Sequence, residues 1–143
     1  MEIRPGRPEE ADTMVEFQLK MAKETEGIRL DRATVAAGVR AVFADPRKGR
    51  YWVAEEDGQV AASLLVTPEW SDWGNATVWW IQSLYVREAH RRQGVFRMMF
   101  EHLRRLVEAD DGLLGLRLYV AANNAAAQRA YEAVGMDCRR YRT

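Results

Sequence analysis

Hydrophobic residues recur three or four positions apart in four segments of the chain, a spacing that predicts amphipathic helices. The four segments are residues 8–27, 32–46, 94–109 and 124–135. Gly27 and Gly135 stand where two of these helices would end, and Asp31 stands where an N-cap would begin the second helix. Pro46 forbids a continuation of that second helix, because proline has no backbone donor.

Runs of β-branched and aromatic residues predict strands between these helices. A short strand opens the chain over residues 2–4, and residues 51–67 predict two strands around an Asp57-Gly58 turn, a pair that suits a tight hairpin. The remaining strands are predicted over residues 76–86, 115–121 and 137–142. The first of these three is nearly all apolar, as is typical of a central strand covered on both faces. The composition of residues 68–75 predicts a loop.

The order of these elements predicts a single α/β domain over residues 1–143. A strand is followed by two helices, three strands, a helix, a strand, a helix and a last strand. This order builds a mixed β-sheet flanked by helices. A chain of 143 residues is long enough to bury a sizeable core in one domain.

Charge, hydropathy and cysteine content exclude several classes of protein. The 21 basic and 21 acidic side chains cancel, so no overall field attracts nucleic acid or an anionic membrane. No apolar run approaches the roughly 18 residues of a membrane span, and residues 1–10 lack the apolar core of a signal peptide, so we expect a cytoplasmic protein. Cys138 is the only cysteine, which excludes an internal disulfide and a multi-cysteine metal site; we expect no metal.

The stretch HRRQGVFRMM, residues 90–99, lies between a predicted strand and a predicted helix. A helix leaves its first four backbone N–H groups unpaired and carries a partial positive charge at that end. If the helix begins at Gly94, these donors converge where the missing side chain lets an anion approach, and nearby charge comes from Arg91, Arg92 and Arg97. The alternative is an ordinary turn with solvated arginines. The stretch fits neither a P-loop nor a dinucleotide-binding signature.

Two short patterns flank the strand predicted over residues 115–121. One is Arg91-Arg92-Gln93-Gly94-Val95-Phe96, and the other is the spaced set Asn124, Ala127, Tyr131 and Gly135. In order and spacing they are similar to two motifs of the GNAT superfamily of N-acetyltransferases, which the chain resembles over about residues 78–136. The family's coenzyme A loop has glycine or alanine where this chain has Phe96, so the phenyl ring is expected to point away from the phosphates.

The resemblance implies a GNAT-like mixed sheet in which two parallel strands splay apart at the coenzyme site. It also implies an acetyl-CoA-dependent N-acetyltransferase that needs no metal. The pantetheine arm of the coenzyme would lie along the end of the central strand, and the pyrophosphate would lie on the glycine loop. The coenzyme-binding residues implied are Leu84, Tyr85, Val86, Arg91, Arg92, Gln93, Gly94, Val95, Phe96, Arg97, Asn124, Ala127 and Tyr131.

Acetyl transfer to an amine requires a neutral amine and a proton for the departing thiolate. Tyr131 matches the family's general acid, although an aromatic residue on a buried helix stripe is the plainer interpretation of the residue alone. Gln82 stands where many relatives have a glutamate base, and a glutamine can position a water or the amine but cannot accept a proton. Deprotonation then falls to Glu24, to Glu26 or to water; a solvated helix end is the alternative for the two glutamates.

An acceptor site is expected beside these groups. Trp79 and Trp80 face opposite sides of a strand, so one of them, with Trp70 or Trp73, would form an aromatic wall for the primary amine of a small molecule or a peptide. Glu24 or Glu26 would aid it, and the residues we expect there are Glu24, Glu26, Trp70 and Trp80. Hydrophobic cover over the sheet, or a contact in a homodimer, is the alternative role of the tryptophans. Two other functions stay open at this stage: a coenzyme-A-binding module without catalysis, and an interaction domain whose glycine loop binds nothing.

Overall fold

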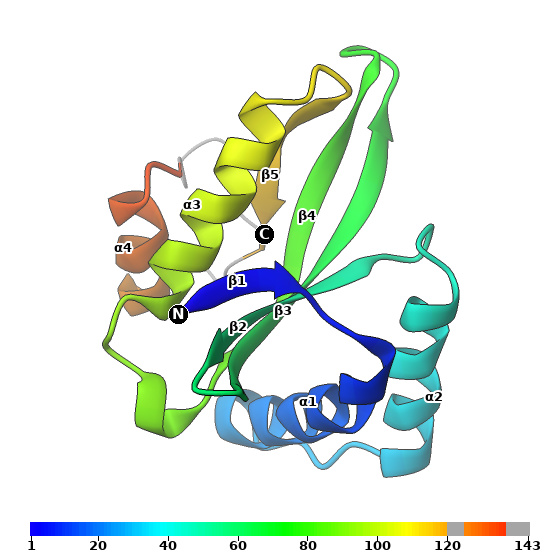
Figure 1. The fold of residues 1–143 in the computed structure, drawn as a ribbon, viewed down its shortest axis with the longest axis vertical. Coiled ribbons are helices and arrows are strands. Elements are labelled where there is room, and N and C mark those ends of the chain that lie inside the picture. Colours follow the sequence, from blue (N-terminus) through cyan, green and yellow to red (C-terminus); the bar gives the residue numbers. More distant parts are fainter. Residues whose placement is uncertain (120–124, 137–143) are drawn as a thin grey trace.

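The computed structural model describes residues 1–119 and 125–136, which form a five-stranded sheet between two pairs of helices (Figure 1). The strands are β1 (Glu2–Pro5), β2 (Arg50–Glu56), β3 (Gln59–Ser71), β4 (Ala76–Val86) and β5 (Leu113–Leu118). The helices are α1 (Ala11–Glu26), α2 (Arg32–Ala44), α3 (Val95–Glu108) and α4 (Ala125–Ala133), with short 3₁₀ turns η1 (Pro8–Glu10) and η2 (Glu88–His90). In the described ranges, no helix is long and apolar enough to cross a membrane.

The strands lie in the order β1-β2-β3-β4-β5. Neighbouring strands from β1 to β4 are antiparallel, whereas β5 runs parallel to β4. The α/β prediction of a mixed sheet flanked by helices is therefore confirmed. The edge strand predicted over residues 137–142 lies outside the described residues.

The end of the first helix, the cap of the second helix and the hairpin turn predicted from the sequence are also confirmed. Gly27 ends α1, and Asp31 caps α2 by accepting a hydrogen bond from the backbone N–H of Thr34 at 3.0 Å. Asp57 and Gly58 both have positive φ, 52° and 78°, as the tight hairpin turn between β2 and β3 requires.

The prediction of a loop over residues 68–75 is wrong for its first half. Residues 68–71 continue β3 and pair with β4 as far as the Ser71–Ala76 pair, so that only residues 72–75 form the turn. The polar composition of this stretch reflects an exposed strand end, and its pairing with the β-branched and aromatic residues of β4 outweighs the local turn propensity. The hairpin consequently extends beyond the helices (Figure 1).

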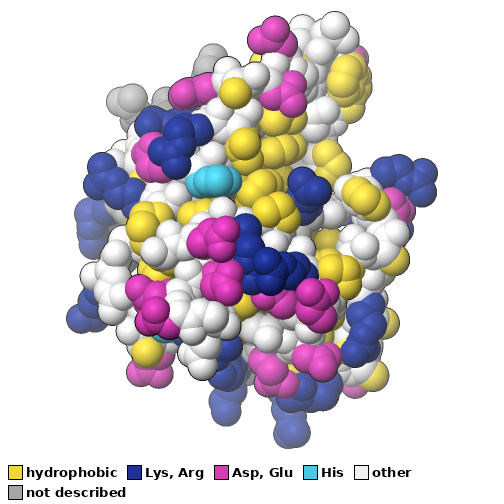
Figure 2. Space-filling view, in the orientation of Figure 1, with side chains coloured by type: hydrophobic (Ala, Val, Ile, Leu, Met, Phe, Trp, Pro, Cys, Tyr) yellow, Lys and Arg dark blue, Asp and Glu magenta, His cyan; other side chains and the backbone are white. Residues whose placement is uncertain are grey.

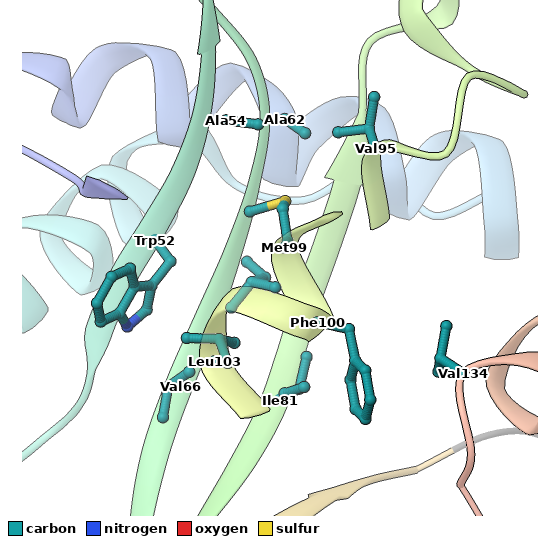
Figure 3. Packing of buried hydrophobic residues seen from close by; sticks show 11 residues of the cluster. Trp52, Ala54, Ala62, Val66, Ile81, Val95, Met99, Phe100, Leu103 and Val134 are labelled. Carbon is teal, nitrogen blue, oxygen red and sulfur yellow. The ribbon is translucent and has the colours of Figure 1, made fainter. Parts of the chain in front are cut away.

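Two hydrophobic clusters join the sheet to its helices. On one face, Met99 and Leu103 of α3 point toward Val66 and Ile81 of the sheet (Figure 3). We call this the α3 cluster; its buried members are Trp52, Ala54, Ala62, Leu64, Val66, Ile81, Val95, Met99, Phe100, Leu103 and Val134. The opposite face carries the α1 cluster, whose buried members are Ala11, Met14, Val15, Phe17, Val39, Tyr51, Val53, Val60 and Tyr85.

A β-bulge interrupts β4 at Ser83, where the pairing with β3 shifts between Tyr85 and Gln82. Ser83 has a φ of 53°, a left-handed conformation that few residues other than glycine adopt. The extra residue resets the alternation of side chains, so that Leu84 packs against the α3 cluster and Tyr85 belongs to the α1 cluster.

Pairing of β4 with β5 ends at Ile81 and Leu118, although β4 continues to Val86. The predicted pair of parallel strands is therefore confirmed, and among the described residues their pairing does not reach the end of β4. The expectation that β4 is covered on both faces is wrong at Gln82, which is exposed because α1 and α2 cover only the lower part of the sheet in Figure 1.

Two adjacent methionines of α3 test the packing of the α3 cluster. Met99 is fully buried, whereas Met98 is 38% exposed on the same helix. Replacing Met99 with Ala should lower the free energy of unfolding by about 2–5 kcal/mol, because it leaves a cavity between helix and sheet. Met98→Ala, with the same change in helix propensity, should cost less than about 1 kcal/mol. Equal losses in urea unfolding would contradict this packing.

A serine pair tests the bulge. Ser83→Gly should raise the free energy of unfolding by up to about 1 kcal/mol, because glycine adopts a positive φ without the steric cost that other residues pay. Ser63 lies on β3, pairs with Tyr85 of β4 and does not have a positive φ. Ser63→Gly should therefore be destabilising. Ser83→Val should cost more than about 1 kcal/mol. If urea unfolding showed that valine is tolerated at position 83, the left-handed bulge would be refuted.

Candidate functional site

The site begins where β4 and β5 separate. Leu84, Tyr85 and Val86 are the last residues of β4 and lie beyond its last pair with β5. On its other side this segment still pairs with β3, through Val86 with Ala62 and Tyr85 with Ser63. The three residues predicted to follow the pantetheine arm therefore line a strand edge that β5 does not cover.

The first turn of α3 lies at the end of this opening. Gly94 is the N-cap, with a φ of 75°, and no side chain caps the helix. In the part of the chain that the structure describes, the backbone N–H groups of residues 94–97 have no hydrogen-bond partner. A Cβ built on Gly94 would meet no atom within 4 Å. Unpaired donors in front of open space, at the positive end of a helix, are suited to an anion.

Phe96, which departs from the family pattern, packs away from these donors. Its ring lies 6.0 Å from the ring of Phe100 and 5.4 Å from that of Tyr131, the latter in an edge contact at 67°. The side chain is partly buried against the α3 cluster. The bulky side chain therefore packs α4 against α3.

The basic residues around Gly94 point in different directions. Arg91 donates from Nε to the carbonyl of Val86 at 2.9 Å and from Nη2 to Glu24 Oε2 at 2.7 Å. Arg92 is exposed and has a φ of 63°. Arg97 lines a shallow pocket between β1 and α3.

Gln93, the remaining polar residue of the loop, donates from Nε2 to the carbonyl of Ala89 at 3.2 Å. This contact closes the loop on itself. Together with the contacts of Arg91, it leaves the backbone donors and the exposed Arg92 as the groups that the loop presents at its helix end.

The second predicted motif is described only in part. Tyr131 and Ala127 lie on α4 and are half-buried, and the Tyr131 ring meets Phe96 as given above. Asn124 lies outside the described residues. Tyr131 is thus brought to the first turn of α3 from a helix that begins about 30 residues later in the chain.

On the opposite side of β4, Glu24 joins α1 to the end of that strand. Glu24 Oε1 accepts from the Tyr85 hydroxyl at 3.4 Å, and its other oxygen accepts from Arg91. Burial raises the pKa of the Tyr85 phenol, and the charge of Glu24 raises it further. The hydrogen bond that Arg91 donates to Glu24 likewise raises the pKa of the Arg91 guanidinium. Tyr85 thus stays protonated and Arg91 charged near neutral pH, so both act as donors.

Further along the same face of β4, Gln82 donates to Thr67 Oγ1 at 2.5 Å. Trp80 stacks on Tyr119, with ring centroids 4.6 Å apart and an angle of 19° between the planes. The guanidinium of Arg117 lies 5.9 Å from the Trp80 ring and pairs with Glu69 at 3.5 Å. These residues project from the part of the sheet that α1 and α2 leave uncovered.

The structure does not bring Trp70 to Trp80. Thr67 is the cross-strand partner of Trp80, and Trp70 is three residues further along β3, so it projects from the other face. Trp70 is 64% exposed there, and Glu26 is exposed on the last turn of α1. Of the residues predicted for acceptor binding, Glu24 of α1 and Trp80 of β4 lie on the same side of the sheet.

Two aromatic residues of this site were not predicted from the sequence in these roles. Tyr119 stands in Trp70's expected place beside Trp80, and Tyr85 is a hydrogen-bond donor to Glu24 as well as a strand residue. For Tyr119, its position two residues after Arg117 in the strand predicted over residues 115–121 was a usable signal, since alternate strand residues share a face. The contact between Tyr85 and Glu24 joins residues 61 positions apart, and no local pattern could reveal it.

Neither histidine lies in this site. His90 Nε2 is 3.2 Å from Glu56 Oε2, and the His102 ring lies 5.5 Å from that of Trp52. Basic and acidic side chains are intermixed on the face drawn in Figure 2. Recognition on such a surface depends on local groups, as the zero net charge predicts.

Comparison with known proteins agrees with this geometry. The profile of the family described as "Acetyltransferase (GNAT) family" matches residues 13–136. A possible acetyltransferase from Clostridium difficile 630 is 39% identical in sequence, with a TM-score of 0.93 over 99% of this chain and 93% of the other. A search of curated proteins by sequence gives no match.

More distant solved structures share the fold. A ribosomal-protein-alanine N-acetyltransferase from Brucella melitensis biovar Abortus 2308 has a TM-score of 0.78 at 13% identity, over 99% of this chain and 95% of that protein. A predicted acetyltransferase with acetyl-CoA from Clostridium acetobutylicum has a TM-score of 0.74 at 16% identity, over 99% and 94%. Since the family profile covers most of the sequence, the chain belongs to the GNAT acetyltransferase family and is an N-acetyltransferase.

Proposed function

We propose that the protein transfers an acetyl group directly from acetyl-CoA to the primary amine of a small molecule or a peptide. One observation carries the proposal: the unpaired backbone donors of residues 94–97, beside the opening between β4 and β5. We further propose the cytoplasm as the location, and the exposed Trp70 and Trp73 at the hairpin tip as the contact of a homodimer.

The donors of the glycine loop suit a pyrophosphate. Each hydrogen bond to a charged group contributes about 1.5–3 kcal/mol, so two or three of these amides would hold the phosphates with useful affinity. The open space in front of Gly94 supports a close approach of the anion to the backbone. Arg92, exposed beside Gly94, adds a positive charge, and the edge of residues 84–86, which no described residue of β5 pairs with, would bind the pantetheine amides.

Acetyl-CoA supplies the acetyl group as a thioester, whose carbonyl carbon is open to attack. In the proposed reaction the amine nitrogen bonds to that carbon, and the carbon–sulfur bond breaks. Tyr131 gives its hydroxyl proton to the leaving sulfur, because a thiol and a phenol have similar reference pKa values, near 8.5 and 10. The proton that the amine loses returns to Tyr131 through solvent, so the products are an amide and a free thiol.

The acceptor would lie on the α1 side of β4. Glu24 is bound at two positions, and because a carboxylate offers about four lone-pair sites, it can still accept from an ammonium group. Gln82, fixed by Thr67, would orient the amine, and Glu24 or water would deprotonate it. The stacked pair of Trp80 and Tyr119 would form the aromatic wall, with Glu26 at its margin.

Gly94→Glu should weaken coenzyme A binding roughly a hundredfold or more, because a carboxylate would occupy the space and repel the phosphates. Gly58→Glu is the matched control: Gly58 also has a positive φ, 78°, and open space around its Cβ position, but it lies in the β2–β3 turn. It should share the strain and leave the affinity unchanged. If calorimetry gave the same Kd for both variants, the phosphates would have to bind elsewhere.

Tyr131→Phe should slow turnover roughly a hundredfold or more and leave the Kd for coenzyme A within about twofold, as expected of a general acid. Tyr51→Phe, which removes the hydroxyl of a buried tyrosine outside the site, should leave turnover unchanged. The assay is thiol release with polyamines, amino acids, aminoglycosides and peptide N-termini as acceptors. An undiminished rate in the Tyr131 variant would remove it from the mechanism, and no thiol release by the unmodified protein with any amine would refute the proposed function.

A further inference from the structure

The side chain of Arg91 makes three contacts, one with α1 and two with the end of β4. Its Nη2 donates to Glu24 at 2.7 Å, and its Nε donates to the carbonyl of Val86 at 2.9 Å. Its guanidinium also lies 5.4 Å from the centroid of the Tyr85 ring. An arginine held at both ends of its planar group in this way has a defined orientation.

These contacts place the guanidinium on the side of β4 away from the glycine-loop donors. Tyr85 belongs to the α1 cluster, where its ring packs 4.9 Å from that of Phe17 on α1. Val95, the first residue of α3, belongs to the α3 cluster on the other face of the sheet. The Arg91 side chain therefore extends from the glycine loop, across the end of β4, to the α1 side of that strand, where the acceptor is proposed to bind.

Glu24 depends on Arg91 for its position. The Glu24 side chain is 43% exposed on the last turn of α1, and fixing such a long side chain costs rotamer entropy that a partner must offset. Its other partner, the Tyr85 hydroxyl, is at 3.4 Å, a long hydrogen bond. The contact with Arg91 is the shorter of the two.

We propose that Arg91 is a positioning residue for acceptor binding: it holds the Glu24 carboxylate where the ammonium group of the acceptor docks. This inference rests on the proposed function and revises the role that the family motif implies for Arg91, which is contact with the coenzyme. The charge that assists the phosphates then comes from Arg92 and from the helix end. The two neighbouring arginines consequently serve different substrates.

The experiment compares Arg91→Gln with Arg92→Gln. Arg91→Gln should raise the KM for the acceptor about three- to tenfold, the range expected for a partly exposed ion pair, with kcat and the Kd for coenzyme A within about twofold. Arg92→Gln should do the reverse, raising the Kd for coenzyme A and sparing the acceptor KM. Arg40→Gln removes an exposed ion pair between α2 and α1, with Asp12, and should change none of these values.

A double variant tests whether Arg91 acts through Glu24. Glu24→Gln should raise the acceptor KM by at least as much as Arg91→Gln, and adding Arg91→Gln to it should have no further effect. Independent, multiplicative effects would overturn the proposal, as would a loss of coenzyme affinity in Arg91→Gln that exceeds the change in acceptor KM.

A measurement on the free protein separates this inference from the proposed function. Amide hydrogen exchange in the last turn of α1, residues 22–26, should be faster in Arg91→Gln than in the unmodified protein, and unchanged in Arg92→Gln. Unaltered exchange would refute the positioning role even if no amine were acetylated. Faster exchange together with an absence of thiol release would support the contact and refute only the proposed reaction.

Discussion

The backbone donors at the start of α3 impose the constraint on which the site depends. Backbone N–H groups are strong donors that need an acceptor, and in the described residues those of Gly94 to Arg97 have none within the protein. A helix usually solves this problem with a serine, threonine or aspartate cap, as Asp31 does for α2. Here the cap is a glycine with a positive φ, which supplies no acceptor and leaves room for one from outside.

The central strand keeps the two sides of the site apart. The bulge at Ser83 directs Leu84 toward the α3 cluster and Tyr85 toward the α1 cluster. One face then offers the glycine loop and Tyr131, and the other offers Glu24 and the aromatic pair of Trp80 and Tyr119. In the described residues pairing with β5 ends at Ile81 while β4 continues to Val86, so the proposed transfer of an acetyl group from donor to acceptor would take place beside the end of β4.

Phe96 shows how a departure from the family motif is accommodated. The side chain of a residue in the first helical turn can pack inward while its amide points along the axis, so its size does not obstruct an anion. The ring contacts Phe100 and Tyr131 and so contributes to placing the proposed acid. The motif position is thus filled by a residue that serves packing between α3 and α4.

Most of the described helices and strands, and the start of α3 at Gly94, could be predicted from the sequence, because these depend on local signals: periodicity, the Asp57-Gly58 turn, the Asp31 cap and the spacing around Gly94. The predictions that failed depend on contacts between segments that are distant in the sequence. The continuation of β3 through residues 68–71 depends on pairing with β4, and the separation of Trp70 from Trp80 depends on the register of that pair. The bond of Arg91 to Glu24 joins residues 67 positions apart, so only the fold could show that a motif arginine turns toward α1.

The most direct test of the account is the response of the amides at the start of α3 to coenzyme A. In backbone ¹H–¹⁵N spectra, the signals of Val95, Phe96 and Arg97 should shift downfield on titration with coenzyme A, as N–H groups do when they donate to phosphate. Pantetheine, which lacks the phosphates, should leave them in place. Signals that stay unchanged with coenzyme A, or that respond equally to pantetheine, would contradict the claim that these donors bind the pyrophosphate.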